Sequence, residues 1–274
     1  MRMPDLAAEH SLAEVIPVGL LTTTRYCWAG CAFCRLAILK PKWDLSRAPS
    51  GLGPDHLNAI DFQAVREVRL RGGLSLAEPF DYWIHVIRGL RKAYAGPITA
   101  FSPVEIWHYH QLEARPIREL VRLLRWAGAD HLGPGGSETF DDTLREQWSP
   151  YRVTRVEWIQ VANAAQEANL GISAAPIVLA GLTTGTWRDY LALLSDFALH
   201  HLEFKPLQSQ GTRLSVMGDA SLLEVSQAVD EVHGLVPDLP LYVRWHSQDV
   251  ADASEILGAA GACALVVTQW EVSP

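Results

Sequence analysis

Three closely spaced cysteines, Cys27, Cys31 and Cys34, form the pattern C-x3-C-x2-C directly after an apolar run. A loop with this spacing can wrap three thiolates around one metal centre, and thiolates are the soft ligands that iron–sulfur clusters require. Three ligands leave one iron of a [4Fe–4S] cluster open, so a small molecule could chelate it. A structural zinc loop and buried thiols are the alternatives, but zinc sites usually have four ligands, arranged in pairs. No second Cys or His pair of suitable spacing follows, so the pattern favours a cluster.

Two glycine-rich segments could bring the backbone or a carboxylate close to a ligand. Gly72 and Gly73 have no Cβ, so their amides and carbonyls can approach a bound molecule closely. In Gly135-Gly136-Ser137-Glu138 a tight turn precedes a carboxylate that could accept hydrogen bonds from an ammonium group or a ribose hydroxyl. A plain turn is the alternative for the first segment. For the second it is a helix start, with Ser137 as the cap.

The segment 102–110 is dense in polar and aromatic residues. Glu105 and His108 are three residues apart, so on a helical turn they share a face. They could act as acid–base groups or orient a substrate. The alternative is a solvated helix start, which is the simpler interpretation for His110.

Two charged residues alternate with apolar residues in a late strand-like segment. Glu203 and Lys205 therefore lie on one face of the expected strand. Inside a barrel an unpaired charge is costly, so each should find a partner or a ligand. Lys205 could bind a substrate carboxylate or phosphate, and internal ion pairs are the alternative.

Eight strand-like segments alternate with helix-like segments along the 274 residues. The strands are expected at 15–24, 67–71, 98–102, 130–132, 171–179, 202–207, 241–245 and 262–267. The helices are expected at 61–66, 82–94, 117–126, 156–169, 190–198, 222–233 and 250–257. Such alternation indicates parallel βαβ units, and eight of them fit a (βα)8 barrel of the TIM type, which needs about 250 residues. We expect one domain over 1–274, with 1–14 a short lead-in and 40–58 an irregular connection.

The barrel interpretation brings the candidate residues together. Active sites of such barrels lie in the loops that follow the C-terminal ends of the strands. The cysteine loop follows the first expected strand, Gly72-Gly73 the second, the segment 102–110 the third and the segment 133–138 the fourth. All four are therefore expected on one face of the barrel.

Composition excludes several other classes of protein. A net charge of −8 argues against a nucleic-acid-binding surface, and no run approaches the roughly 18 apolar residues of a membrane span. The first residues lack a basic region followed by an apolar core, so we expect no secretory signal. Three of the four cysteines are clustered, which suits a reducing cytoplasm and not a disulfide framework. Cys263 lies in an apolar run and is expected to pack in the core.

The cysteine spacing, with the aromatic Phe33 before the third cysteine, resembles the signature of the radical S-adenosylmethionine (SAM) enzymes. Further segments occur in the order found in the branch of aminofutalosine synthase, dehypoxanthine futalosine cyclase and the deazaflavin-precursor (FO) synthase subunits. These segments are Arg71-Gly72-Gly73, Phe101-Ser102-Pro103-Val104-Glu105-Ile106, Gly135-Gly136-Ser137-Glu138, Asp141-Asp142, Arg145, Ser149-Pro150, Glu157-Trp158 and Phe204-Lys205-Pro206-Leu207.

The resemblance implies a radical SAM barrel in which Cys27, Cys31 and Cys34 hold a [4Fe–4S] cluster and the open iron binds SAM. An electron from the reduced cluster then releases a 5′-deoxyadenosyl radical, and a flavodoxin- or ferredoxin-type protein would supply the electron. By position, the residues that contact SAM would be Phe33, Gly72, Gly73, Ser137, Glu138 and, at the SAM carboxylate, Arg152.

The part of the chain that should bind substrate departs from the branch. Arg71 stands at a usual Gln, Lys205 is unusual in its strand, and the segment 181–183 lacks the His and Glu of the branch. We therefore expect a divergent relative, a transferase or lyase that starts C–C bond formation, cyclisation or rearrangement of a small metabolite in cofactor or natural-product biosynthesis. Glu105, His108 and Lys205 are its candidate catalytic residues. The alternatives are a menaquinone (futalosine) or deazaflavin pathway enzyme proper, and a non-catalytic barrel that binds a cluster or zinc.

Overall fold

The computed structural model describes residues 12–25, 27–36, 57, 60–74, 78–179, 184–246 and 249–272. Most of the expected lead-in at 1–14 and of the connection at 40–58, together with the segment 181–183, lies outside the described residues.

A parallel sheet forms the centre of the molecule, and its strands follow the order β3-β2-β1-β8-β7-β6-β4, with β5 paired to β6. The strands are β1 Glu14–Thr22, β2 Glu67–Arg71, β3 Ile98–Ala100, β4 Ile172–Ala174, β5 Ile177–Val178, β6 Leu199–Pro206, β7 Leu241–Trp245 and β8 Ala264–Val272. Single parallel bridges join His131 to Thr99 of β3 and to Gly171 just before β4. His131 thus takes the place of a strand between β3 and β4. The expected barrel-type α/β fold is confirmed.

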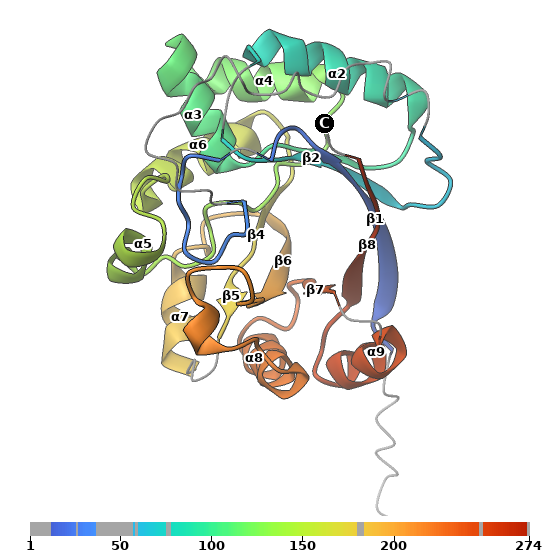
Figure 1. Ribbon diagram of the computed structural model, residues 1–274, viewed down its shortest axis with the longest axis vertical. Helices are drawn as coiled ribbons and strands as arrows, with labels where there is room; N and C mark the ends of the chain where they lie inside the picture. Colours follow the sequence, from blue (N-terminus) through green and yellow to red (C-terminus); the bar gives the residue numbers. More distant parts are fainter. Residues whose placement is uncertain are drawn as a thin grey trace, which may run out of the picture.

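Helices lie outside the curled sheet (Figure 1). They are α2 Phe80–Ala93, α3 Pro103–Glu113, α4 Ile117–Ala127, α5 Asp142–Trp148, α6 Arg155–Glu167, α7 Thr184–Ala192, α8 Leu222–Leu235 and α9 Val250–Ala259, with a short 3-10 turn at Ser215–Met217. Capping boxes start α6, at Thr154 with Glu157, and α8, at Ser221 with Glu224. Each box satisfies two backbone N–H groups that the first turn leaves free. Among the described residues, no helix has both the length and the apolar character needed to cross a bilayer.

Alternation along the strands separates an apolar core from a polar lumen. On β2, Val68 and Leu70 are fully buried in the main apolar cluster, which joins the strands to the helices. The intervening residues of β2 carry charge, and Arg69 is buried and reaches Glu203 of β6. Successive strand residues point to opposite faces, so β2 presents Glu67, Arg69 and Arg71 to the lumen.

Four expected elements differ from the structure. Residues 61–66 form a turn and no helix, because the Asp61 carboxylate accepts a hydrogen bond from the Gln63 amide, a local bond that competes with the helix. The expected strand at 130–132 is only the bridge at His131. The expected strand at 171–179 is split into β4 and β5 at Pro176, which has no N–H to donate to a ladder.

The helix expected at 190–198 is also misplaced. The structure has α7 at Thr184–Ala192, followed by turns in which the amides of Leu194 and Phe197 bond to the carbonyls three residues before them. The apolar spacing thus continues through turns that are not helical, and β6 begins at Leu199. The prediction for Cys263 is wrong as well, since Cys263 is exposed.

Candidate functional site

The cysteine loop follows β1 at the C-terminal end of the barrel strands. Cys27 and Cys31 are buried and Cys34 is partly exposed. Burial raises the pKa of the Cys27 thiol and raises that of Cys31 to about 12, and the charges of the neighbouring cysteines act in the same direction. The backbone N–H groups of Leu74 and Ala29 hydrogen-bond Cys27 and lower its pKa. The three thiols therefore lie close enough to interact, although no three His, Cys, Asp or Glu side chains of the described chain are arranged to hold a single metal ion.

The rest of the barrel fixes the shape of this loop. The Arg213 guanidinium donates to the Gly30 carbonyl, and the Arg213 amide donates to the Ala32 carbonyl at 2.9 Å. The Ala32 amide in turn donates to the Trp148 carbonyl at 2.6 Å. Gly30 has a φ of 59°, a conformation that glycine adopts without the penalty of a side chain. Sequence reasoning missed Arg213, because its partner is 183 residues away in the chain.

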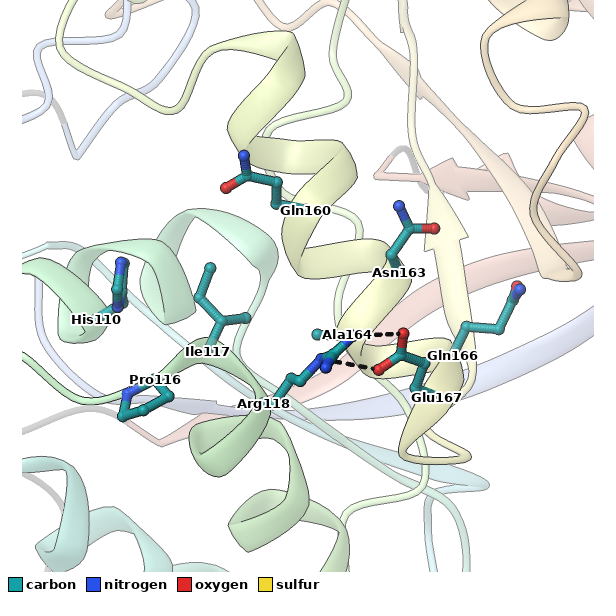
Figure 2. Close-up of a pocket in the computed structure, with 9 residues that line it drawn as sticks. All are labelled: His110, Pro116, Ile117, Arg118, Gln160, Asn163, Ala164, Gln166 and Glu167. Atoms are coloured by element: carbon teal, nitrogen blue, oxygen red, sulfur yellow. Dashed lines mark hydrogen bonds and ion pairs between the residues drawn. The ribbon is translucent and has the colours of Figure 1, made fainter.

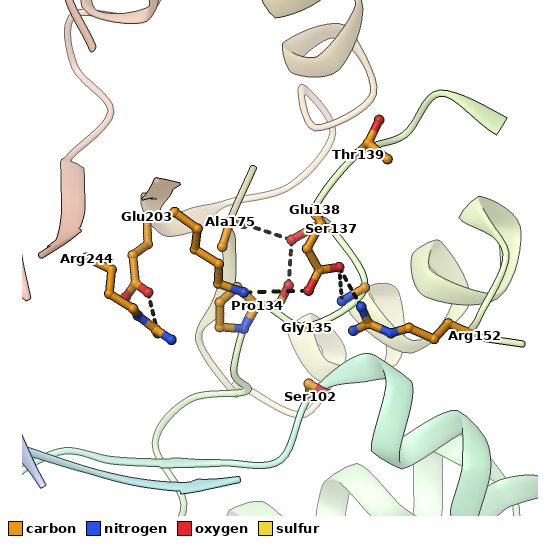
Figure 3. A network of polar contacts seen from close by, with 12 residues as sticks. Ser102, Pro134, Gly135, Ser137, Glu138, Thr139, Arg152, Ala175, Glu203 and Arg244 are labelled. Carbon is orange, nitrogen blue, oxygen red and sulfur yellow. Dashed lines mark hydrogen bonds and ion pairs between the residues drawn. The ribbon is translucent and has the colours of Figure 1, made fainter. Parts of the chain in front are cut away.

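Beside the cysteines, Glu138 holds two cations, Arg152 and Lys205. Figure 3 shows Arg152 at the Glu138 carboxylate. Its Oε2 lies 3.0 Å from Arg152 Nη1 and accepts a hydrogen bond from the Gly136 amide at 3.0 Å, while its Oε1 lies 3.6 Å from Lys205 Nζ. Burial opposes ionisation, but the charges of Arg152 and Lys205 prevail and lower the pKa of Glu138 to about 2. Burial lowers the pKa of Lys205 to about 8. The Arg152 guanidinium also lies 5.7 Å from the centre of the Phe33 ring.

The loop that carries Glu138 is tied down by side chains from several elements. The Ser137 hydroxyl donates to the Pro134 carbonyl at 2.5 Å and accepts from the Ala175 amide at 2.8 Å. Arg145 donates to the carbonyls of Gly136 and Thr139, both at 2.7 Å. The fully buried Ser137 is thus engaged with the backbone, and we interpret it as a support for Glu138 and not as a ligand contact. No local sequence pattern at Arg145 or Ser137 predicts these hydrogen bonds to the loop backbone.

Glu105 lies at the start of α3, directly after β3. The chain turns there through Phe101, whose φ of 59° is rare for a residue with a side chain. Ser102 donates to one oxygen of Glu105 at 2.8 Å, and the Gly72 amide also hydrogen-bonds the carboxylate. The other oxygen, Oε1, is buried without a partner in the described chain. Burial raises the pKa of Glu105 to about 7.

The two glycines after β2 meet their own chain. A Cβ on Gly72 would lie 2.1 Å from the Thr23 hydroxyl oxygen and 2.8 Å from the Thr24 nitrogen. The Gly73 amide donates to the Thr24 carbonyl at 2.8 Å. The pair therefore lets the loop after β2 lie against the loop after β1, and the Gly72 amide is used to hold Glu105.

The two histidines of α3 lie in different surroundings. The His108 ring is partly buried against Trp28 of the cysteine loop, at 4.7 Å between ring centres, and burial lowers the pKa of His108 to about 4. His110 instead bonds the Arg115 carbonyl at 2.7 Å. It lines a groove of roughly 610 Å³ between α3, α4 and α6 (Figure 2). That groove holds none of the other predicted site residues, so the structure separates His110 from the site.

A network of buried charges lies below the site in the lumen. Arg69 donates to both oxygens of Glu67 at 2.9 Å and to Glu203 Oε2 at 2.5 Å. Glu203 is fully buried and also pairs with Arg244, as Figure 3 shows. Burial opposes ionisation of Glu203, but Arg244 and Arg69 hold its pKa well below the usual range. Of the two alternatives expected for this strand, internal ion pairs or contact with a ligand, Glu203 thus shows internal ion pairs.

The structure therefore brings most of the predicted residues together. Cys27, Cys31 and Cys34 act on one another electrostatically, Arg152 acts on Cys31 and Cys34, and Glu138 joins Arg152 to Lys205. Glu105 and His108 lie at the edge of this group, since Glu105 accepts a hydrogen bond from the Gly72 amide and the His108 ring contacts Trp28. Ser137 supports it from behind, and His110 lies elsewhere.

No family model matches the chain, but individual proteins do. Over 250 residues it is 24% identical to aminodeoxyfutalosine synthase of Thermus thermophilus, covering 86% of this chain and 65% of the relative. Over 176 residues it is 26% identical to FO synthase of Mycobacterium leprae, covering 63% of this chain and 20% of the relative. The chain thus spans less than two thirds of the length of these relatives.

Solved structures agree on the fold. Methylornithine synthase (PylB) superposes with a TM-score of 0.69 at 13% identity, over 94% of this chain and 75% of that one. The [FeFe]-hydrogenase maturase HydG superposes with a TM-score of 0.67 at 12% identity, over 94% of this chain and 58% of that one. These relatives and neighbours are radical SAM proteins. The resemblance expected from the cysteine spacing and the strand-end motifs is confirmed.

Proposed function

We propose that this chain is a radical SAM enzyme in which Cys27, Cys31 and Cys34 ligate a [4Fe–4S] cluster. The observation that carries the proposal is the meeting of three thiols with a buried Arg–Glu pair at the C-terminal end of a parallel barrel. Thiolates suit iron–sulfur clusters, and two backbone amides already hydrogen-bond Cys27. When bound, the cluster would supply the electron that cleaves SAM to a 5′-deoxyadenosyl radical.

The chain's own residues fit a role in binding SAM. Glu138 stays ionised and could accept hydrogen bonds from a ribose hydroxyl or an ammonium group, since Arg152 and Lys205 hold its pKa at about 2. Arg152 is the cation on which Cys31 and Cys34 act, so it could balance thiolate charge and bind the SAM carboxylate. Phe33 lies beside Arg152 and would pack near the adenine. Glu105 Oε1 is free to accept one more hydrogen bond.

Three groups could handle protons on the substrate side. Burial gives Glu105 a pKa of about 7 and Lys205 one of about 8, so both can exchange protons near neutral pH. Burial keeps His108 neutral, with a pKa of about 4. We assign them as acid–base or orienting groups in a C–C bond formation, cyclisation or rearrangement of a small metabolite. The buried setting would keep water from the reacting atoms.

The relatives act in menaquinone and cofactor biosynthesis. Arg71 and Lys205 depart from their branch, so we propose a related reaction on a different small metabolite. A flavodoxin- or ferredoxin-type electron donor completes the proposal. The rival is a barrel that keeps the cluster, or binds zinc, without catalysis.

The test uses anaerobically reconstituted protein with SAM and dithionite but no substrate, and mass spectrometry to detect 5′-deoxyadenosine. We expect the product from wild type and from Cys263→Ala, whose thiol is exposed, and none from Cys34→Ala. Both variants remove one thiol, so they separate the site from a general loss of cysteine. Iron without 5′-deoxyadenosine would favour the non-catalytic barrel, and bound zinc without iron would refute the cluster.

A further inference from the structure

The lumen of the barrel is built in layers, because alternate residues of each strand point inward. In one layer Arg69 of β2 reaches across to Glu203 of β6 at 2.5 Å. Opposite charges meet in this layer, and Arg244 adds a second cation to Glu203. Its charges are therefore paired.

The next layer toward the mouth has a different composition. Two residues further along the same strands, β2 presents Arg71 and β6 presents Lys205. The register between β6 and β7 pairs Phe204 with Val243, so Lys205 and Arg244, the next residues on each strand, lie side by side. Three cations thus border this layer.

Arg71 differs from Arg69 in having no counterion of its own in the described part of the barrel. Its guanidinium makes no ion pair or side-chain hydrogen bond with any of the residues that the structure describes, whereas Arg69 two residues earlier binds two carboxylates. Burial, together with the nearby charges of Arg244 and Arg69, lowers the pKa of Arg71 to about 9, and the charges of Glu203 and Glu271 oppose this shift only in part. Glu271, at the rim, is itself paired with Arg25. A buried cation without a partner is costly unless a ligand supplies the opposite charge.

The charges in the described lumen and mouth also leave room for an anionic ligand, because cations outnumber carboxylates there. Five cations face three carboxylates that are held ionised. The cations are Arg69, Arg71, Arg152, Lys205 and Arg244, and the carboxylates are Glu67, Glu138 and Glu203.

Neither Glu105 nor the thiolates remove this excess of positive charge. The Glu105 carboxyl has a pKa of about 7, so it is only partly ionised near neutral pH. The cysteines act on Arg152 and are not among the main charges acting on Arg71.

We propose that Arg71, with Lys205 and Arg244 beside it, binds an anionic group of the substrate, a carboxylate or a phosphate, in the layer above Glu203. The planar guanidinium can hold such a group with two parallel hydrogen bonds, and the ammonium adds a point charge. The anion site is inferred from the charges of the lumen alone. The inference rests on the proposed function only where it calls the bound anion a substrate.

The test measures the thermal stability of the anaerobically reconstituted protein with three probes of similar shape at equal ionic strength: benzoate, phenyl phosphate and neutral benzamide. A ligand that binds the folded state raises the Tm with its concentration. We expect at least one of the two anions, but not benzamide, to raise the Tm of wild type, and the stronger of them identifies carboxylate or phosphate as the preferred group. Arg71→Met should weaken anion binding at least tenfold, and Arg71→Lys should keep part of it. Arg118→Met, which removes an exposed arginine on the outer helices, should leave it unchanged.

Three results would overturn the inference: no stabilisation of wild type by either anion, equal stabilisation of wild type and Arg71→Met, or failure of Arg71→Met to fold. The last would mean that Arg71 supports the fold and is not left for a ligand. Wild type that forms 5′-deoxyadenosine without binding these anions would refute the anion site alone. Anion binding that depends on Arg71 in protein that never cleaves SAM would refute the proposed function alone.

Discussion

Arg69 and Arg71 are two residues apart on one strand, yet we expect their removal to change stability in opposite directions. Arg69 holds Glu67 and Glu203 with three hydrogen bonds of 2.5 to 2.9 Å, and its side chain is only 4% exposed. Arg69→Met would leave the partly buried Glu67 without its arginine and the fully buried Glu203 with Arg244 as its remaining ion-pair partner among the described arginines. Breaking a buried ion pair in this way costs about 3–5 kcal/mol, a large share of the roughly 5–15 kcal/mol that stabilises a folded protein.

Arg71→Met removes a cation that pairs with no carboxylate of the described residues. Its pKa lies near 9 where an arginine ordinarily has 12.5, and one pKa unit corresponds to about 1.4 kcal/mol. Since part of that penalty is relieved by solvent at the mouth, we expect Arg71→Met to stabilise the ligand-free protein by about 1–3 kcal/mol. Residues that bind ligands commonly reduce stability in this way.

Urea unfolding followed by tryptophan fluorescence measures both effects as shifts in the midpoint. Arg66→Met is the control, because Arg66 pairs with Glu14 on the surface, where both side chains are more than half exposed. An exposed pair contributes about 0–1 kcal/mol. The reasoning is refuted if Arg69→Met and Arg66→Met lose similar amounts of stability, or if Arg71→Met is as damaging as Arg69→Met.

Three further predictions concern the residues around the site. The pKa of Glu105 is raised to about 7 from 4.5, so the stability that its carboxyl group contributes is complete below pH 4.5 and is lost as the pH rises through 7. The Tm of wild type should therefore fall relative to the Tm of Glu105→Gln between pH 5 and pH 8. Parallel curves of Tm against pH for the two proteins would contradict this. Gly72→Ala would place a Cβ 2.1 Å from a side-chain oxygen of the loop after β1 and should lower the Tm. Gly234→Ala lies within α8, where an added Cβ would meet nothing within 4 Å, and should raise stability by about 0.5–1 kcal/mol. Equal effects of the two substitutions would show that the close approach at Gly72 is unimportant. Arg213→Met removes the bond to the Gly30 carbonyl and should speed the loss of iron to a chelator with little change in Tm, and an unchanged rate would mean that this bond does not hold the cysteine loop.

The fold and the position of the cysteine loop after the first strand could be predicted from the sequence because their signals are local. The cysteine spacing lies within eight residues, and β2, β3 and β7 follow short apolar patterns. The failures have physical reasons of their own. Pro176 interrupts a strand that apolar content alone predicts to be continuous, and His131 makes single bridges where the pattern predicts a strand.

The partners of the charged residues could not be predicted, since they come from strands far apart in the chain. Arg69 and Glu203 are 134 residues apart, and nothing near either residue indicates the other. For the same reason, only the folded barrel shows that Arg71 lacks a counterion within the described part of the chain. Ser137 looked like a ligand contact or a cap, but its hydroxyl bonds Pro134 and Ala175 instead.

The central claim is that three thiolates hold a cluster whose remaining iron binds SAM. The measurement that tests it most directly is the electron paramagnetic resonance spectrum of the dithionite-reduced, anaerobically reconstituted protein, recorded with and without SAM. We predict a [4Fe–4S] signal in wild type and in Cys263→Ala that changes on addition of SAM, and its loss in Cys34→Ala. A cluster signal that SAM leaves unchanged would contradict the account.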